Sequence, residues 1–305
     1  MKDLRDAGHA CRPDMSGCFL VPPMKRFVMF LCSWLLCYIV GSVIMGFVMG
    51  GELSATKVRI CLVIQDVVVF VVPALLTAVA VCRRPAELLL LTRPKSLWVF
   101  VMVVMLVVSM IPAINMVISW NQTLRLPDSM NGLYEWMVES ERSAEGIMSL
   151  VTGSTTVGGL IISLLIVGVF AGFSEELFFR GGLQRLLTTS SVNPHVAIWL
   201  TAFIFSAIHL QFFGFFPRLI LGGVFGYLAY WSGTLWVPVV AHVTNNCLAV
   251  AAMWIKNRSV EGGEIGLDTI GSADGGTGTV AIVLCSVLLS VIWLGLIYKR
   301  SKRVV

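Results

Sequence analysis

Charged residues are scarce in this sequence. Asp, Glu, Lys and Arg make up only 13% of its 305 residues, whereas a soluble domain carries about 25%. Hydrophobic residues make up 57% of the chain, and the mean hydropathy is +0.88. A chain of this composition cannot cover a surface that faces water, which excludes a soluble globular protein. We predict an all-α fold, a polytopic transmembrane helical bundle.

The sequence also lacks the cysteine patterns of zinc sites and disulfide frameworks. Its eight cysteines include no C-x-x-C pair and lie mostly inside apolar runs, so we expect them to be small apolar core residues. The formal net charge is +5, but the basic residues lie beside the apolar runs. This placement argues against a nucleic-acid partner and indicates a protein whose surroundings are the lipid bilayer.

Apolar runs long enough to cross a bilayer recur along the chain. The first run is too long for a signal-peptide core and lacks a convincing cleavage site, so we expect a retained span. No internal repeat is visible, and we place no domain boundary. About eight spans are predicted, at residues 27–50, 60–81, 97–119, 157–178, 195–213, 217–232, 235–255 and 280–298.

These spans divide the chain into four segments: a polar N-terminus (1–26), N-terminal spans with an outer amphipathic loop (27–155), a core that holds the candidate site residues discussed below (156–255), and an outer loop with the last span and a basic tail (256–305). With the N-terminus inside, 15 of the 22 Lys and Arg fall on the cytoplasmic side. We therefore predict a bacterial inner-membrane protein with both termini cytoplasmic. Apolar residues at helical spacing within 120–156 predict an amphipathic helix at the outer interface.

Two adjacent carboxylates follow the fourth run, in the stretch GFSEELFFRGGLQR at 172–185. An ionised side chain inside a bilayer costs about 2.5–3.5 kcal/mol, so chains rarely keep one without a use for it. Glu176 and Arg180 are four residues apart with the acid first, which favours a salt bridge along one helix face. Glu175 points about 100° away and has no cation at that spacing. Glu175 is therefore the free carboxylate and the candidate general base.

Two histidines in predicted spans each have a partner one helical turn away. Phe205 precedes His209 by four residues and can pack on its imidazole. His242 precedes Asn246 by four residues, so an imidazole and a carboxamide can point at one substrate oxygen. Together with Glu175, these are the parts needed to activate water and stabilise an oxyanion. The same histidines with a carboxylate could instead hold a divalent metal, and the residues alone leave both alternatives open.

Asp66, with Gln65 beside it, interrupts the second apolar run. The simpler interpretation is a buried polar pair bonded to a neighbouring helix, because one polar side chain without partners does not indicate a particular reaction. The alternative is a supporting role near the site.

Taken together, the motifs resemble those of one known family. The CPBP family of membrane proteases, also called Abi, includes CAAX prenyl endopeptidases and bacteriocin-processing or immunity proteins. The similarity covers about residues 155–255. Three motifs carry it, in this order along the bundle: Glu175-Glu176-x-x-x-Arg180, Phe205-x-x-x-His209 and His242-x-x-x-Asn246.

The resemblance implies a role for each of these residues. Glu175 would activate the water together with His209, while His242 and Asn246 would bind the oxyanion or help to hold a metal. A zinc site made by His209, His242 and Glu175 and a metal-free glutamate mechanism both agree with what is known of the family. The substrate would be a membrane-associated protein or peptide. The other motif residues would give structural support: Glu176, Arg180 and Phe205.

The depths of Glu175 and His209 disagree with the predicted spans. If the fifth span begins near Pro194, His209 lies about 22 Å along it, whereas Glu175 sits nearer the cytoplasmic end of its own span. A fourth span that runs on through Leu187 would bring the two level. A later start of the fifth span would do the same, if residues 181–193 dip into the protein.

Two other classes of function use the same buried groups. A transporter or proton relay also places Glu and His inside the membrane, but many transporters have paired halves, and residues 27–155 and 156–298 show no such symmetry. A non-catalytic bacteriocin-immunity membrane protein would keep the site without using it. We expect an intramembrane endopeptidase, which is a hydrolase.

Overall fold

The computed structural model describes residues 15, 17–94, 96–190, 192–258, 270–272 and 277–303. Among these residues the secondary structure is helical, and the extended pairing is confined to an isolated bridge between Phe19 and Cys82. The predicted all-α fold is confirmed. Residues 1–14 of the predicted polar N-terminus and most of the predicted outer loop at 256–279 lie outside the described residues.

Helices of membrane-spanning length dominate the described part of the chain, and the predicted span at 195–213 differs from the others. It is a shorter apolar helix, α11 (Pro194–Ala207). Its 14 residues reach about 21 Å, less than the roughly 30 Å of a hydrocarbon core, because the chain turns inside the bundle after Ala207. Seven helical stretches are long and apolar enough to cross a membrane: Pro23–Met49, Ala55–Val81, Trp98–Gln122, Val157–Thr189, Phe212–Ser232, Trp236–Arg258 and Thr279–Ser301.

Two of these long stretches contain π-helical turns. Such turns insert an extra residue and re-aim the side chains that follow, and they occur frequently at functional sites. The second stretch consists of α3 (Ala55–Ile64), η1 (Gln65–Val71) and α4 (Val72–Val81). The fourth consists of α8 (Val157–Ser163), η3 (Leu164–Phe170), α9 (Ala171–Glu176), η4 (Leu177–Gln184) and α10 (Arg185–Thr189).

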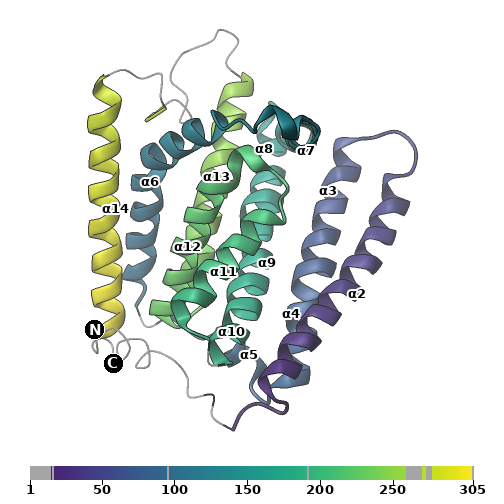
Figure 1. Cartoon of the computed structure of the whole chain (residues 1–305), viewed down its shortest axis with the longest axis vertical. Coiled ribbons are helices and arrows are strands. Elements are labelled where there is room, and N and C mark those ends of the chain that lie inside the picture. The colour runs from purple at the N-terminus through teal and green to yellow at the C-terminus, as the bar shows by residue number, and fades with distance from the viewer. Residues whose placement is uncertain are drawn as a thin grey trace.

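The helices form a bundle in which both flanks cover a central group. In Figure 1, α2 and α3 lie at one flank, α6 and α14 at the other, and α9, α11, α12 and α13 between them. The start of α2 and the end of α14 lie at the same end of the bundle. The other helices of the bundle are α2 (Pro23–Met49), α5 (Pro85–Leu88), α6 (Trp98–Gln122), η5 (Phe212–Gly214), α12 (Phe215–Ser232), α13 (Trp236–Arg258) and α14 (Thr277–Arg303).

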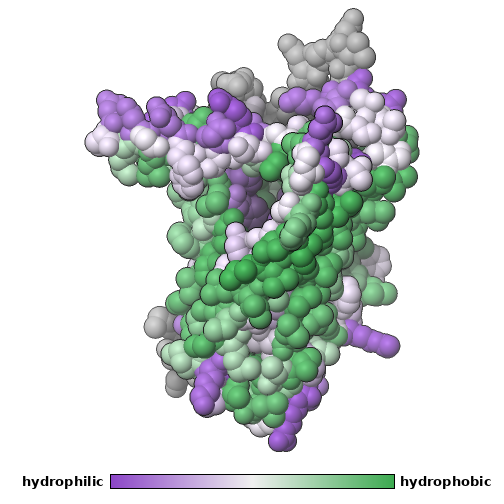
Figure 2. All heavy atoms as spheres, turned by 90° about the vertical axis from the view of Figure 1, so that its right-hand side faces the viewer, coloured by the Kyte–Doolittle hydropathy of each residue, from purple (hydrophilic) through white to green (hydrophobic). Residues whose placement is uncertain are grey.

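The predicted amphipathic helix within 120–156 is confirmed as α7 (Asn131–Thr152), which follows the 3-10 turn η2 (Asp128–Met130). It lies across the upper end of the bundle in Figure 1. Leu133 and Trp136 on this helix stay exposed, as expected of a helix that lays an apolar face on lipid. In Figure 2, hydrophobic residues cover the flank of the molecule below this hydrophilic end.

The expectation that the cysteines are small apolar core residues is only partly correct. Cys32 and Cys285 are exposed, and Cys18 and Cys82, which are buried, form a disulfide with their Cα atoms 5.5 Å apart. Two backbone bonds bring these cysteines together: Leu20 N–H donates to the Val81 carbonyl at 2.9 Å, and Arg83 N–H to the Cys18 carbonyl at 3.0 Å. The pairing joins residues 64 positions apart, which no local spacing signals.

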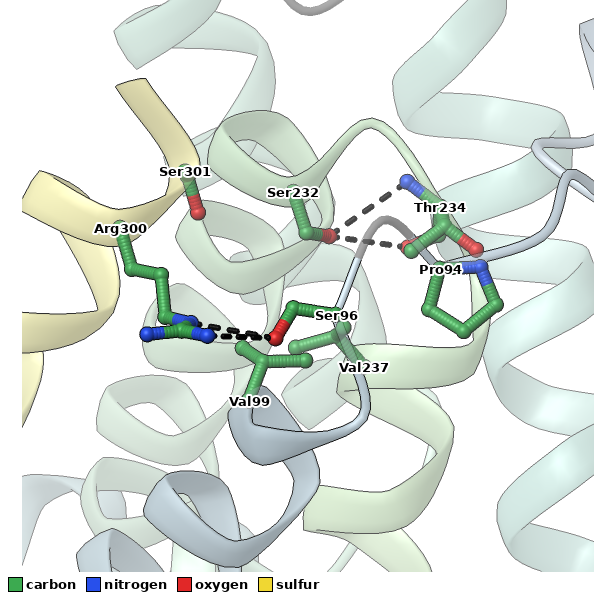
Figure 3. Close-up of a pocket in the computed structure, with 8 residues that line it drawn as sticks. All are labelled: Pro94, Ser96, Val99, Ser232, Thr234, Val237, Arg300 and Ser301. Carbon is green, nitrogen blue, oxygen red and sulfur yellow. Dashed lines mark hydrogen bonds between the residues drawn. The ribbon is translucent and has the colours of Figure 1, made fainter. Parts of the chain in front are cut away.

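A small polar pocket joins α6, α14 and the turn between α12 and α13 (Figure 3). Arg300 donates from Nε and Nη2 to the Ser96 hydroxyl at 3.1 and 3.0 Å, and the Ser232 hydroxyl bonds the backbone of Thr234. Its volume of about 30 Å³ has room for little more than water. We interpret these hydrogen bonds as contacts that hold the helix ends together.

The α12 helix approaches its neighbours closely at two glycines. The Gly222 carbonyl accepts from Arg180 Nη2 and the Gly226 carbonyl from Gln184 Nε2, each at 3.0 Å. A Cβ atom at Gly226 would lie 2.8 Å from both Gln184 Oε1 and Ile198 Cγ2. Only glycine allows this approach without displacing a neighbour.

Gly226→Ala should therefore lower the free energy of unfolding by about 1–3 kcal/mol, because the added methyl group overpacks this contact. The matched control is Gly46→Ala in α2, where nothing lies within 4 Å of an added Cβ. Removing a helical glycine there should be neutral or stabilising by up to about 1 kcal/mol. Thermal unfolding in detergent measures both variants, and equal melting temperatures would contradict the close approach.

Candidate active site

The two adjacent glutamates of α9 point to different neighbours. Glu176 is fully buried, and its Oε1 accepts a hydrogen bond from Arg180 Nη1 at 2.6 Å. The Glu175 side chain keeps 15% exposure and lines a cavity. The geometry therefore matches the predicted division into a paired and a free carboxylate.

Arg180 makes several contacts inside the bundle. Besides Glu176, it donates to the Gly222 carbonyl. Its guanidinium carbon lies 4.9 Å from the ring centroid of Phe205 and 5.6 Å from that of Phe225. A cation in a dry interior is tolerated when it is paired and packed on aromatic faces.

His242 receives its orientation from Glu176. Its Nδ1 lies 2.8 Å from Glu176 Oε1, and its Nε2 lies 3.6 Å from Glu175 Oε2. Because the carboxylate accepts, Nδ1 carries the proton of that bond. The rings of Phe225 and Phe205 pack against the imidazole at centroid distances of 5.1 and 5.8 Å. The support that Glu176 gives thus extends to His242, a contact that sequence reasoning missed because 66 positions separate the two residues.

His209 lies in the turn directly after α11. Its Nδ1 donates to the Phe205 carbonyl at 2.7 Å, and the two rings meet edge to face at 5.0 Å, as the four-residue spacing predicts. With its proton on Nδ1, the neutral ring leaves Nε2 as an acceptor. The next residue, Leu210, has a φ of 53°, a conformation that is unusual for a bulky side chain and that collects at functional sites.

Asn246 lies one turn beyond His242 on α13 and also lines the cavity. Its Nδ2 donates to the Val167 carbonyl of η3 at 3.1 Å. The side-chain amide has two hydrogens, so this bond leaves one of them for another acceptor.

One cavity of about 460 Å³ collects all four residues predicted as catalytic. The conflict in depth disappears because the fourth stretch runs without a break to Thr189. Glu175 lies 14 residues before Thr189, about 21 Å, and His209 lies 15 residues after Pro194, about 22 Å. The extension through Leu187 is therefore the correct one of the two alternatives.

The predicted metal ligands do not form a metal site in the part of the chain that the structure describes. No group of three or more His, Cys, Asp or Glu side chains is arranged there to hold an ion. Among the described residues, the histidines and carboxylates of the cavity are therefore not arranged around a common ion.

Residues 157–248 match the model of one family, described as type II CAAX prenyl endopeptidase Rce1-like. We call these residues the Rce1-like region, after the family they resemble. The predicted CPBP resemblance is confirmed over these residues, which include every residue of the three motifs. Together with the seven long apolar helices, the match identifies an integral membrane protein.

One known protein is similar to part of this chain. The uncharacterized protein YpbD of Bacillus subtilis (strain 168) is 28% identical over 83 residues, which are 26% of this chain. The chain spans only 39% of the length of YpbD. No solved structure matches the chain.

Two further charged residues line the cavity of the Rce1-like region: Asp66 from η1 and Arg218 from α12. Arg218 donates to Gln211 Oε1 at 2.7 Å and to the Gln211 carbonyl. Sequence reasoning singled out Asp66 but not Arg218. A charge inside an apolar span is a usable signal, but no spacing ties either residue to the motifs.

The α7 helix packs on the turn that follows His209. Glu141 accepts the Phe213 N–H at 3.3 Å, and the Tyr134 ring meets the Phe213 ring edge to face. Burial raises the pKa of the Glu141 carboxyl, and the Phe213 N–H and the Arg218 charge lower it only in part. Glu141 thus holds α7 against the turn after His209, although burial disfavours its charged form.

Glu141→Gln should flatten part of the pH dependence of stability. A carboxyl with a raised folded-state pKa binds its proton more tightly in the folded protein, so stability is lost as pH rises from its ordinary pKa through the raised one. Glutamine keeps an acceptor for Phe213 and removes the charge, so the variant should melt at a higher temperature than wild type at neutral pH. Melting curves between about pH 4 and about pH 8 test this, with the exposed Glu135→Gln as control. Identical pH profiles for both variants would contradict it.

Arg180→Met should destabilise the Rce1-like region by about 3–5 kcal/mol, because it leaves the Glu176 carboxylate buried without its cation. The matched control is Arg142→Met, which breaks an exposed ion pair with Glu139 and should change stability by no more than about 0.5 kcal/mol. Denaturation in mixed micelles measures both. A loss at Arg180 no larger than at Arg142 would show that the buried pair does not hold the site.

Proposed function

We propose that this protein is an intramembrane endopeptidase that hydrolyses a peptide bond of a membrane-associated protein or peptide. One observation carries the proposal: Glu175, His209, His242 and Asn246 surround a single cavity inside a membrane bundle. The match to a family of CAAX-type membrane proteases supports the same reaction class. The bacterial inner membrane and cytoplasmic termini remain part of this proposal.

Glu175 and His209 are suited to activate a water molecule. The Glu175 carboxylate is the one of the adjacent pair that does not bond Arg180, and the His209 Nε2 is an acceptor in the neutral ring. A water between them donates one hydrogen to each acceptor. As its oxygen attacks the carbonyl carbon, Glu175 takes the proton, which is general base catalysis.

His242 and Asn246 are suited to stabilise the oxyanion of the tetrahedral intermediate. Asn246 has one amide hydrogen beyond its bond to Val167. His242 faces the cavity with Nε2, which donates a hydrogen bond when the ring carries a second proton. Donors fixed in a site of low dielectric lower the barrier more than the same donors in water do.

Substrate access from the side of the bundle fits the shape of the molecule. Figure 2 shows a hydrophilic hollow in the otherwise hydrophobic flank, below the hydrophilic upper end. A substrate segment lying in or on the bilayer meets such an opening without first crossing into water. This favours a membrane-associated protein or peptide over a soluble one.

The proposal predicts that Glu175→Gln, His209→Ala and His242→Ala each lower proteolysis by at least about 10²-fold while the protein still folds and inserts. The assay uses purified protein in lipid vesicles and a pool of internally quenched membrane-partitioning peptides, some with an S-prenylated cysteine near the C-terminus. Glu139→Gln, on the exposed face of α7, is the control. Wild-type cleavage by Glu175→Gln would overturn the mechanism, and a biological activity that survives in that variant would point to a non-catalytic protein.

A further inference from the structure

Asp66 is a carboxyl group that reaches the active-site cavity from outside the family region. It belongs to η1 in the second membrane stretch, whereas the Rce1-like match begins at residue 157. The structure places Asp66 in the wall of the same cavity as Glu175, with η1 packed against α9. Only 2% of Asp66 is exposed. Asp66 is thus buried against a neighbouring helix, as the simpler interpretation expects, and it also lies at the site.

The Asp66 carboxyl lacks a full set of partners within the protein. Its Oδ2 atom is buried and has no hydrogen-bond partner among the described residues. An unsatisfied buried polar atom costs about 1–3 kcal/mol, so such an atom at a cavity wall points to a partner that arrives with the ligand. This observation is independent of the sequence motifs.

Asp66 shares its cavity with a second carboxyl group, that of Glu175. The Ser174 side chain also contacts Asp66. Histidine and arginine side chains line the same cavity: His209, His242 and Arg218. Two neighbouring carboxyl groups in a dry site do not both ionise, and such pairs commonly divide into one acid and one base. Glu175 has the histidine contacts that suit a base, which leaves Asp66 as the acid.

We propose that Asp66 supplies the proton that the leaving amine takes when the peptide bond breaks, an inference that rests on the proposed function. Water gives one proton to Glu175 and forms the new C–O bond. The C–N bond then breaks as the nitrogen takes the Asp66 proton. Transfer of the Glu175 proton to Asp66, through the cavity, restores both groups. The protons balance, and no co-reactant is needed.

The test compares an amide with a thioester at the same scissile position. An amine cannot leave as an anion and needs a proton, whereas a thiolate leaves without one. The probe is the quenched peptide that the wild-type protein cleaves fastest, together with its thioester analogue. Asp66→Asn should lower kcat for the amide by about 10²-fold while KM stays unchanged, and should leave thioester hydrolysis within about threefold of wild type.

Control variants separate this role from a structural one. The ratio of amide to thioester rate is measured in one preparation, so it does not depend on the fraction of folded protein. Gln65→Asn changes a polar neighbour of Asp66 that has no acidic proton, and should keep the wild-type ratio. Asp66→Glu retains an acid and should recover part of the amide rate.

Each outcome decides the inference. Equal losses for amide and thioester in Asp66→Asn, or no loss for either, would overturn the assignment of Asp66. Glu175→Gln should lose both reactions, because both need an activated water, so the proposed function can stand while the inference fails. A wild-type protein that cleaves no member of the pool would overturn the proposed function and this inference together.

Discussion

The buried carboxylate of Glu176 is the interaction on which the site depends. A single oxygen atom accepts from Arg180 at 2.6 Å and from His242 at 2.8 Å, so it ties the fourth membrane stretch to α13. Taking such charges out of water is costly, and the pair is incompletely satisfied, since Glu176 Oε2 and Arg180 Nε have no partner among the described residues. An ion pair of this kind adds little net stability. Its consequence is that the His242 ring is held in one position, with a proton on Nδ1.

The position of Glu176 also decides what its neighbour does. Consecutive residues of a helix project about 100° apart, so a Glu176 held by Arg180 leaves Glu175 facing the cavity. The two glutamates thereby divide into a support and a reactive group without any difference in residue type. The His242 ring lies between the two glutamates: its Nδ1 bonds Glu176, and its Nε2 faces Glu175 at 3.6 Å.

The cavity is lined both by residues that match a known family and by residues outside that match. The Rce1-like match ends at residue 248 and begins at 157, and this region supplies the motif side chains. The second membrane stretch closes the cavity with Asp66, and α7 packs on the turn behind His209. The second membrane stretch is therefore part of the cavity wall, although it lies outside the family match.

The sequence by itself determined the features that depend on composition and on helical periodicity. Low charge predicted the membrane bundle, and four-residue spacing predicted the Glu176–Arg180 bond and the Phe205–His209 contact, because both partners lie on one helix or its continuation. Only the tertiary structure decided which helices meet. It paired Glu176 with His242, joined Cys18 to Cys82, shortened the helix at Pro194–Ala207 and brought Asp66 to Glu175. These pairs lie far apart in sequence, and their contact follows from the packing of whole helices, which no local pattern encodes.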